Sequence, residues 1–158
     1  MADRGLTGIL LAGGESTRFG SPKGAAVFAG ETLGARAWRL LGDACDERLV
    51  VGPGGLADPG TGPVAAIAAG LRAASHDVAV VVPVDMPLLT AEALHALADA
   101  CRDAAVAQRG PLPCAIRRDA FPETDERRLR AVLETLDLAS VQLDERLLLN
   151  VNEPRDLR

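Results

Sequence analysis

The sequence predicts an α/β sandwich built on a mainly parallel β-sheet. Through the first two thirds of the chain, short apolar runs alternate with longer segments whose apolar residues recur every three or four positions. The run DVAVVVPVDMP at 77–87 is apolar and β-branched without alternation, which is typical of a strand buried on both faces. Together these patterns favour strands that are joined and covered by helices.

Glycine and proline clusters separate the elements expected in the first half. The pair Gly13-Gly14 ends the first apolar run, the cluster GPGG stops the second, and Gly62-Pro63 precedes an Ala-rich helix. The elements expected here are a strand at 6–12, a helix at 31–41, a strand at 48–52, a helix at 64–74 and the strand at 77–87.

In the second half, capping residues and periodicity indicate two more helices. Thr90 is expected to cap a helix over 91–104, with Glu92 in its first turn, and Asp125 can cap a helix over 126–136. The remaining apolar runs are expected to be short extended segments at 104–108, 112–118, 138–143 and 146–151.

Length and composition predict one globular domain spanning 1–158. The net charge of -5 disfavours nucleic-acid binding, because affinity for DNA or RNA depends on clustered basic residues. The sequence contains no apolar run near the roughly 18 residues needed to cross a membrane, and no signal-peptide pattern. Cys45, Cys101 and Cys114 are widely spaced, which favours free thiols in a reducing compartment, so we expect the protein in the cytoplasm.

The loop after the first strand has the composition of a phosphate-binding turn. Gly13 and Gly14 would allow backbone N–H groups to approach oxygen atoms closely, and Arg18 and Lys23 could neutralise a triphosphate. The spacing is neither that of a Walker A loop nor G-x-G-x-x-G. Taken alone, the pattern is equally consistent with a tight strand-to-helix turn that carries two exposed basic residues.

Four carboxylate or amide positions are further candidates. Asp85 directly follows the buried run VVVPV, where a carboxylate is costly unless it meets a cation or several donors, so we favour a Mg²⁺ ligand over a turn cap. Asp58 lies in a Gly- and Pro-rich loop and could seat a sugar hydroxyl or the amino edge of a base, or simply form a turn before proline. Asn150 and Asn152 alternate and would face the same way on an extended backbone.

The glycine pair, Asp58 and Asp85 lie at or beyond the carboxyl ends of the first three expected strands. In open α/β sheets, ligands bind beyond those ends. We therefore expect the loops AGGESTR, GPGGLADPGTGP and VDMP to converge on one site.

Four segments of the chain match known sequence motifs. LAGGESTRFGSPK is similar to the signature L-A-G-G-x-S-x-R-x-G-x-x-K, and GPVAAIAAGL, VDMP and NVNEPRDL are similar to G-P-L-A-G-I, x-D-x-P and N-x-N-x-P. The first motif resembles that of the nucleotidyltransferase superfamily, and the four together resemble the molybdenum cofactor guanylyltransferases within it. The four matches occur in the family's order and span essentially the whole chain.

The resemblance implies a Rossmann-like three-layer sandwich of the nucleotide-diphospho-sugar transferase type. It implies transfer of GMP from GTP to molybdopterin with Mg²⁺ and release of pyrophosphate, and a molybdoenzyme or cofactor-delivery protein as a partner. The site residues that it implies are Leu11, Ala12, Gly13, Gly14 and Asp58 for the nucleotide, Lys23 for its phosphates with Arg18 as a second cation, Asp85 for the metal, and Asn150 and Asn152 on the pterin side.

Several positions depart from the family pattern. Pro22 replaces the Asp that commonly precedes the motif lysine, and Gly52 stands where a nucleotide-contacting Asn often follows the second strand. The segment at 53–57 is shorter than usual, so the motifs alone do not fix the match of Asp58 or the base that is selected. A cytidylyltransferase or another NTP transferase of the same fold, and a non-catalytic nucleotide-binding module in cofactor delivery, are therefore the alternatives.

Overall fold

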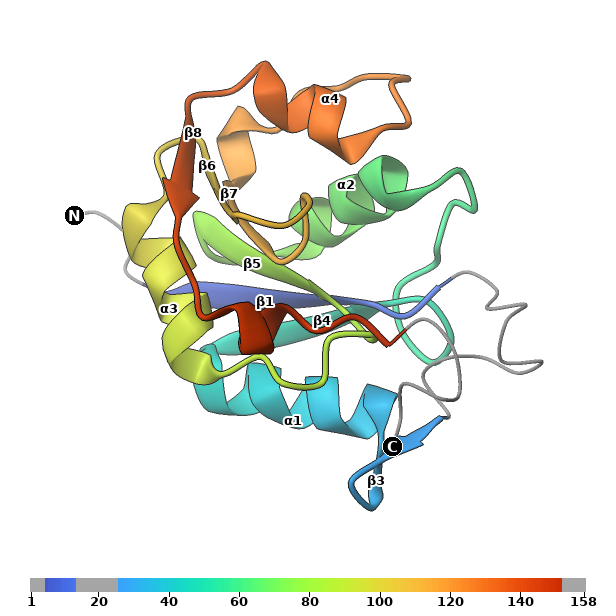
Figure 1. The fold of residues 1–158 in the computed structure, drawn as a ribbon. Coiled ribbons are helices and arrows are strands. Elements are labelled where there is room, and N and C mark those ends of the chain that lie inside the picture. Colours follow the sequence, from blue (N-terminus) through green and yellow to red (C-terminus); the bar gives the residue numbers. More distant parts are fainter. Residues whose placement is uncertain (1–4, 14–25, 152–158) are drawn as a thin grey trace.

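The computed structural model describes residues 5–13 and 26–151, and a six-stranded sheet runs through its centre (Figure 1). The order across the sheet is β4-β1-β5-β7-β6-β8. The sheet strands are β1 (Leu6–Leu11), β4 (Glu47–Val51), β5 (Val78–Pro83), β6 (Ala104–Ala107), β7 (Cys114–Arg117) and β8 (Leu138–Val141). A separate antiparallel hairpin is formed by β2 (Val27–Phe28) and β3 (Glu31–Thr32).

The sheet is mixed but mainly parallel, as predicted. β1 pairs in parallel with β4 and β5, and β6 pairs in parallel with β8. β7 is antiparallel to both of its neighbours, so among the six sheet strands described it alone runs in the opposite direction. The three strands whose loops carry candidate residues, β4, β1 and β5, are therefore adjacent and co-directional.

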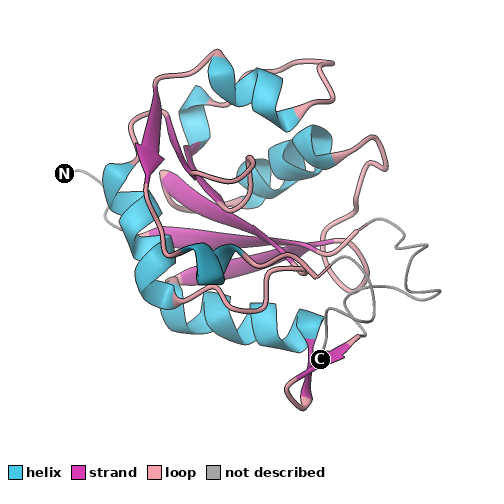
Figure 2. Cartoon of the chain, viewed as in Figure 1, coloured by secondary structure: helices cyan, strands magenta, loops and turns pink. Residues whose placement is uncertain are grey.

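Helices cover both faces of the sheet and complete a three-layer sandwich (Figure 2). α1 and α3 pack on one face, whereas α2 and α4 pack on the other. The α-helices are α1 (Leu33–Ala44), α2 (Pro63–Ala73), α3 (Ala91–Ala100) and α4 (Leu129–Glu134), and short 3₁₀ helices span Arg118–Ala120 and Glu145–Leu148.

The β5 strand contributes to two hydrophobic clusters because its successive side chains point to opposite faces. Val80 and Val82 pack with α1 and α3, whereas Ala79 and Val81 pack with α2 and α4. All four are fully buried. This burial on both faces explains the uninterrupted apolar run in the sequence.

The helix starts show where local sequence signals were sufficient. The Thr90 side chain accepts a hydrogen bond from the Ala93 backbone N–H at 3.2 Å, so the predicted cap of α3 is confirmed. α1 begins at Leu33, two residues after the expected start, because residues 31–32 pair in the β2–β3 hairpin. Thr32 caps α1 in the same way, accepting from Ala35 N–H at 3.1 Å.

Two expectations for the second half were wrong. α4 begins at Leu129 with Arg128 as its N-cap residue, so Asp125 does not cap it. The segment 146–151 was expected to be extended, but Glu145–Leu148 forms a 3₁₀ helix. Its start is stabilised by the Asp144 carboxylate, which accepts a hydrogen bond from the Arg146 backbone N–H at 3.0 Å.

The three cysteines are free and weakly acidic. Cys114 is buried, and Cys45 and Cys101 are partly buried. Burial raises the pKa of Cys45 to about 12 and that of Cys101 to about 11, and it also raises the pKa of Cys114. Because the thiolate is the reactive form, these side chains are poor nucleophiles at neutral pH.

Within the residues described, no helix is long and apolar enough to span a membrane.

Glu47 stabilises the end of the sheet at which β1 begins. Its carboxylate accepts hydrogen bonds from the buried Thr7 hydroxyl and from the Ser75 backbone N–H and hydroxyl, all at 2.8 Å. Partial burial by itself would raise the pKa of Glu47, but these hydrogen bonds outweigh it, and the net pKa is lowered. The ionised carboxylate is therefore the form that the fold favours.

We expect Glu47→Ala to lower the free energy of unfolding at pH 7 by about 1–3 kcal/mol, because the buried Thr7 hydroxyl loses its acceptor. The pKa of Glu47 is lower in the folded state, so its contribution is complete above the unfolded-state pKa and is lost as pH falls through the lowered value. Urea unfolding at several pH values measures both effects. Replacing the exposed Glu123 with alanine is the control, and equal behaviour of the two variants would contradict the prediction.

Candidate functional site

The carboxyl ends of β4, β1 and β5 lie side by side at one edge of the sheet, on the right in Figure 1. In the pairing register, Leu11 of β1 is opposite Val51 of β4 and Pro83 of β5. Gly13 and Asp85 each lie two residues beyond that level, on adjacent strands. The topology thus confirms that the three candidate loops leave the sheet at the same edge.

The exits of β1 and β4 are packed closely against each other. The Ala12 backbone N–H donates to the Val51 carbonyl at 2.9 Å, which extends the pairing beyond the strands. Gly52 has φ of +133°, and a Cβ atom there would lie 2.6 Å from the Gly13 nitrogen and 2.8 Å from the Ala12 carbonyl carbon. A side chain at position 52 is therefore excluded by backbone, which explains glycine at this departure from the family motif.

The shortened loop after β4 closes on its own backbone. The Gly52 N–H donates to the Leu56 carbonyl at 2.9 Å, and the Leu56 N–H donates to the Val50 carbonyl at 2.8 Å. A third bond joins the Gly55 N–H to the Gly52 carbonyl at 3.1 Å. This turn directs the following residues back over the end of β1.

Asp58 lies directly against Gly13. A Cβ atom on Gly13 would be only 1.8 Å from Asp58 Oδ2, so the absence of a side chain at Gly13 leaves room for this carboxylate. Asp58 Oδ1 accepts a hydrogen bond from the Gly60 N–H at 2.8 Å, which orients the group. The structure therefore brings Asp58 to the first motif despite the short loop before it.

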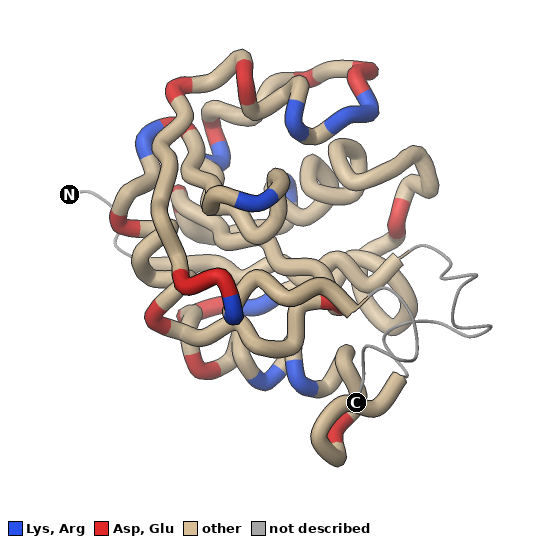
Figure 3. Tube along the Cα trace, viewed as in Figure 1, with Lys and Arg blue, Asp and Glu red and all other residues tan. Residues whose placement is uncertain are grey.

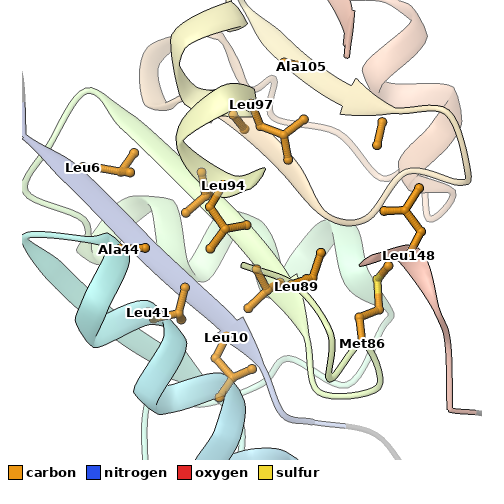
Figure 4. Close-up of a cluster of buried hydrophobic side chains, with 14 of the residues drawn as sticks. Leu6, Leu10, Leu41, Ala44, Met86, Leu89, Leu94, Leu97, Ala105 and Leu148 are labelled. Carbon is orange, nitrogen blue, oxygen red and sulfur yellow. The ribbon is translucent and has the colours of Figure 1, made fainter. Parts of the chain in front are cut away.

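Asp85 is half-buried, and its backbone is held both by the adjacent Met86 and by the distant Val151. Met86 is 5% exposed and packs in the cluster with Leu89 and with Leu148 of the C-terminal 3₁₀ helix (Figure 4). The Val151 N–H donates to the Asp85 carbonyl at 2.7 Å, and Val151 itself is fully buried. The last described residue of the chain is thus hydrogen-bonded to the backbone of Asp85.

The remaining sequence candidates are only partly placed. Leu11 and Ala12 are half-buried at the end of β1, and Asn150 is exposed next to Val151, on the segment bonded to Asp85. The other four lie outside the described residues: Gly14, Arg18, Lys23 and Asn152.

Residues 8–141 match the family of the MobA-like NTP transferase domain. The chain belongs to this family. A relative from Deinococcus radiodurans, named probable molybdenum cofactor guanylyltransferase, is 32% identical over 178 aligned positions that cover 96% of this chain and 92% of the relative. The protein is thus a nucleotidyltransferase of the MobA-like type.

Solved structures with the same fold include enzymes of more than one named activity. Molybdopterin-guanine dinucleotide biosynthesis protein A from Archaeoglobus fulgidus superposes with a TM-score of 0.75 at 20% identity, covering 96% of this chain and 94% of that one. The 4-diphosphocytidyl-2C-methyl-D-erythritol synthase from Anaerococcus prevotii gives 0.74 at 11% identity, covering 96% and 94%. These two structural similarities establish the fold, but they do not identify the nucleotide that this chain uses.

The charge distribution of this MobA-like site is uneven (Figure 3). None of the described residues at the three strand ends, 12–13, 52–58 and 84–87, is Lys or Arg, whereas two are Asp. A triphosphate at this edge therefore depends on cations supplied from elsewhere. Arg18 and Lys23 of the first motif, the cations expected from the sequence, lie outside the described residues.

The carboxylates at this edge fit a magnesium ion that is shared with a ligand. Within 5–13 and 26–151, no group of three or more His, Cys, Asp or Glu side chains could hold a metal by itself. Mg²⁺ is, however, usually held by one or two carboxylates together with phosphate oxygens and water. Asp85 provides one such carboxylate, and Gly13 follows the adjacent strand at the same level.

Sequence reasoning missed two features of this site. Gly52 was interpreted only as a lost contact, although a glycine directly after a buried strand is a recognisable signal of close backbone approach. The hydrogen bond from Val151 to Asp85 had no local signal, because it joins residues far apart in the chain.

Proposed function

We propose that this protein transfers GMP from GTP to molybdopterin and releases pyrophosphate. The observation that carries the proposal is that Gly13, which lies against Asp58, and Asp85 follow the carboxyl ends of two adjacent parallel strands. The name of the Deinococcus relative and the four motifs support guanine as the base and molybdopterin as the acceptor. By the same argument, a molybdoenzyme or a cofactor-delivery protein would receive the product.

In this proposal the residues position charged groups and transfer no proton. A phosphate oxygen of the acceptor attacks the α-phosphorus of GTP, and the bond to pyrophosphate breaks as the electron pair leaves with it. The nucleophile is already negatively charged, so alignment and charge neutralisation are sufficient. This agrees with the three weakly acidic cysteines and with the lack of a nucleophile–base motif in the sequence.

Each residue then has a distinct task. The backbone N–H groups of Gly13 and Gly14 would hold phosphate oxygens, and Lys23 and Arg18 would offset the charge that develops on pyrophosphate. Asp85 would hold Mg²⁺, which supplies charge neutralisation at the phosphates when bound. Asp58, oriented by the Gly60 N–H, would contact the nucleoside, while Leu11 and Ala12 contact it from the end of β1. Asn150 and Asn152 would lie on the pterin side.

The first test is nucleotide-dependent thermal stabilisation in the presence of Mg²⁺. At 100 times its dissociation constant, GTP should stabilise the protein by about 2.7 kcal/mol, or roughly 5–10 °C in Tm for a chain of this size. CTP, UTP and ATP at the same concentration should give much smaller shifts. A shift with CTP alone would instead favour a cytidylyltransferase, for which the solved structures of the same fold leave room.

The second test measures pyrophosphate release with purified molybdopterin and each nucleotide in turn. We expect release with GTP only, and only when molybdopterin is present. GTP binding without pyrophosphate release would favour a non-catalytic module that binds a nucleotide during cofactor delivery.

A further inference from the structure

The loop from β5 to α3, residues 84–90, has little regular structure of its own although it carries Asp85. Met86 and Leu89 are buried beneath it, and Thr90 ends it as the N-cap of α3. The carbonyl of Asp85 accepts the hydrogen bond from Val151. These contacts fix the start and the end of the loop.

Arg36 of α1 contacts the middle of this loop. Its Nε donates to the Pro87 carbonyl at 2.6 Å, two residues after Asp85. The Arg36 side chain is 25% exposed, so this bond to a charged donor is partly shielded from water. α1 is one of the helices that pack with Met86 and Leu89 in the same hydrophobic cluster, and its two arginines appear in blue along the helix in Figure 3.

The same guanidinium also contacts the β2–β3 hairpin. It lies over the Phe28 ring at 5.2 Å from the centroid, and its Nη1 is 3.5 Å from Glu31 Oε1. The hairpin begins at Val27, four positions after Lys23 in the sequence. Arg36 therefore joins the loop that carries Asp85 to the segment that follows the phosphate-binding motif.

Both backbone contacts lie on the segment that follows the Asp85 side chain along the chain. Val151 fixes the peptide unit that contains the Asp85 carbonyl, and Arg36 fixes the carbonyl of Pro87. With both in place, the backbone from Asp85 to Pro87 is held by groups outside the loop, which restricts how the Asp85 side chain can be presented. Removing Arg36 would remove the contact at Pro87 and leave the Val151 hydrogen bond and the buried side chains in place.

We propose that Arg36 is a positioning residue that orients Asp85 for the metal-bound triphosphate. The inference rests on the proposed function, since it takes Asp85 as the metal ligand. Partners that orient a metal ligand typically contribute 10- to 100-fold to metal affinity. Arg36 acts through the backbone of the loop, so we expect an effect at the lower end of that range.

The test compares Arg36→Ala, Arg36→Lys and Arg39→Ala, with Mn²⁺ as a spectroscopic probe for the metal. Arg39 is the matched control, because it lies one turn along α1 and ion-pairs with Glu31 at 2.9 Å, whereas the hydrogen bond to the Pro87 carbonyl comes from Arg36. Mn²⁺ affinity is measured by electron paramagnetic resonance with saturating GTP, and hydrogen exchange is followed in the peptide covering 84–90. Circular dichroism and Tm confirm that each variant is folded.

We expect Arg36→Ala to weaken Mn²⁺ binding roughly tenfold and to accelerate exchange in residues 84–90. Arg39→Ala should stay within about twofold of wild type in both measurements, as expected for an exposed ion pair. Arg36→Lys should recover part of the affinity, because lysine keeps a charged donor but lacks the planar fork. If Arg36→Ala fails to fold, an intermediate loss in Arg36→Lys is the expected result.

Two failures are distinguishable. If wild type and Asp85→Asn bind Mn²⁺ equally with GTP, the assignment of Asp85 is wrong and the role of Arg36 fails with it. If Asp85→Asn abolishes binding while Arg36→Ala, or Arg36→Lys in its place, matches wild type, the proposed function stands and the inference about Arg36 is overturned.

Discussion

Replacing Asp85 with asparagine should lower turnover at saturating GTP by roughly 10²–10³-fold, comparable to the loss of one preorganised electrostatic group in other active sites. The amide has nearly the shape of the carboxylate but lacks the negative charge that holds Mg²⁺. Lys23→Ala should also lower turnover, because it removes a cation from the developing pyrophosphate. Pyrophosphate release with molybdopterin at saturating GTP and Mg²⁺ measures both variants.

Asp99→Asn is the matched control for Asp85→Asn. Asp99 is exposed on α3 and lines a groove with Leu6 and Val78, which begin β1 and β5 at the opposite end of the sheet. The same loss of charge there should leave turnover unchanged. Near-normal rates in both Asp85→Asn and Lys23→Ala would reject the assignment of these two residues.

Gly52→Ala should be the most damaging single substitution in the loop after β4. The new Cβ would meet the Gly13 nitrogen at 2.6 Å, and the obstacle is backbone that a rotamer change cannot move aside. We expect a loss of about 3 kcal/mol in the free energy of unfolding, from strained backbone together with overpacking. GTP-dependent stabilisation should also fall, because displacing Gly13 disturbs the phosphate-binding motif.

Gly54→Ala separates backbone strain from the clash. Gly54 also has a positive φ, +83°, but no atom lies within 4 Å of a Cβ built there. Gly54→Ala should therefore lower the free energy of unfolding by only about 1–2 kcal/mol, the usual penalty for a non-glycine residue in the left-handed region. It should leave the stabilisation by GTP unchanged. Urea unfolding and thermal shifts with GTP measure both variants. Equal losses of unfolding free energy in the two variants would contradict the prediction, because they would show that the backbone at the end of β1 readily moves to accommodate a side chain.

The sequence was informative wherever the signal was local. The uninterrupted apolar run of β5 indicated burial on both faces, and Thr90 identified the start of α3. The rule that ligands bind at the carboxyl ends of parallel strands then placed Gly13 and Asp85 at one edge before their register was known. Each of these inferences depended on neighbouring residues or on a general property of parallel sheets.

Features that depend on distant partners could not be predicted in this way. Hydrophobic periodicity carries no information about strand direction, so the antiparallel orientation of β7 was not foreseen. Asp125 has the composition of a helix cap, yet α4 begins four residues later. The contacts of Val151 and Arg36 with the loop that carries Asp85 join segments separated by more than fifty residues. The roles of Asp85, Lys23 and Arg36 are predictions that the variants above test.

The self-contained turn at residues 52–56 has an evolutionary consequence. Because its hydrogen bonds are made within the turn and to Val50, extra residues could be inserted before Asp58 without breaking any pairing of the central strands. Doubling the length of a flexible connection costs only about 0.6 kcal/mol in closure entropy. This stretch can therefore diversify by insertion and deletion while the scaffold around it is preserved.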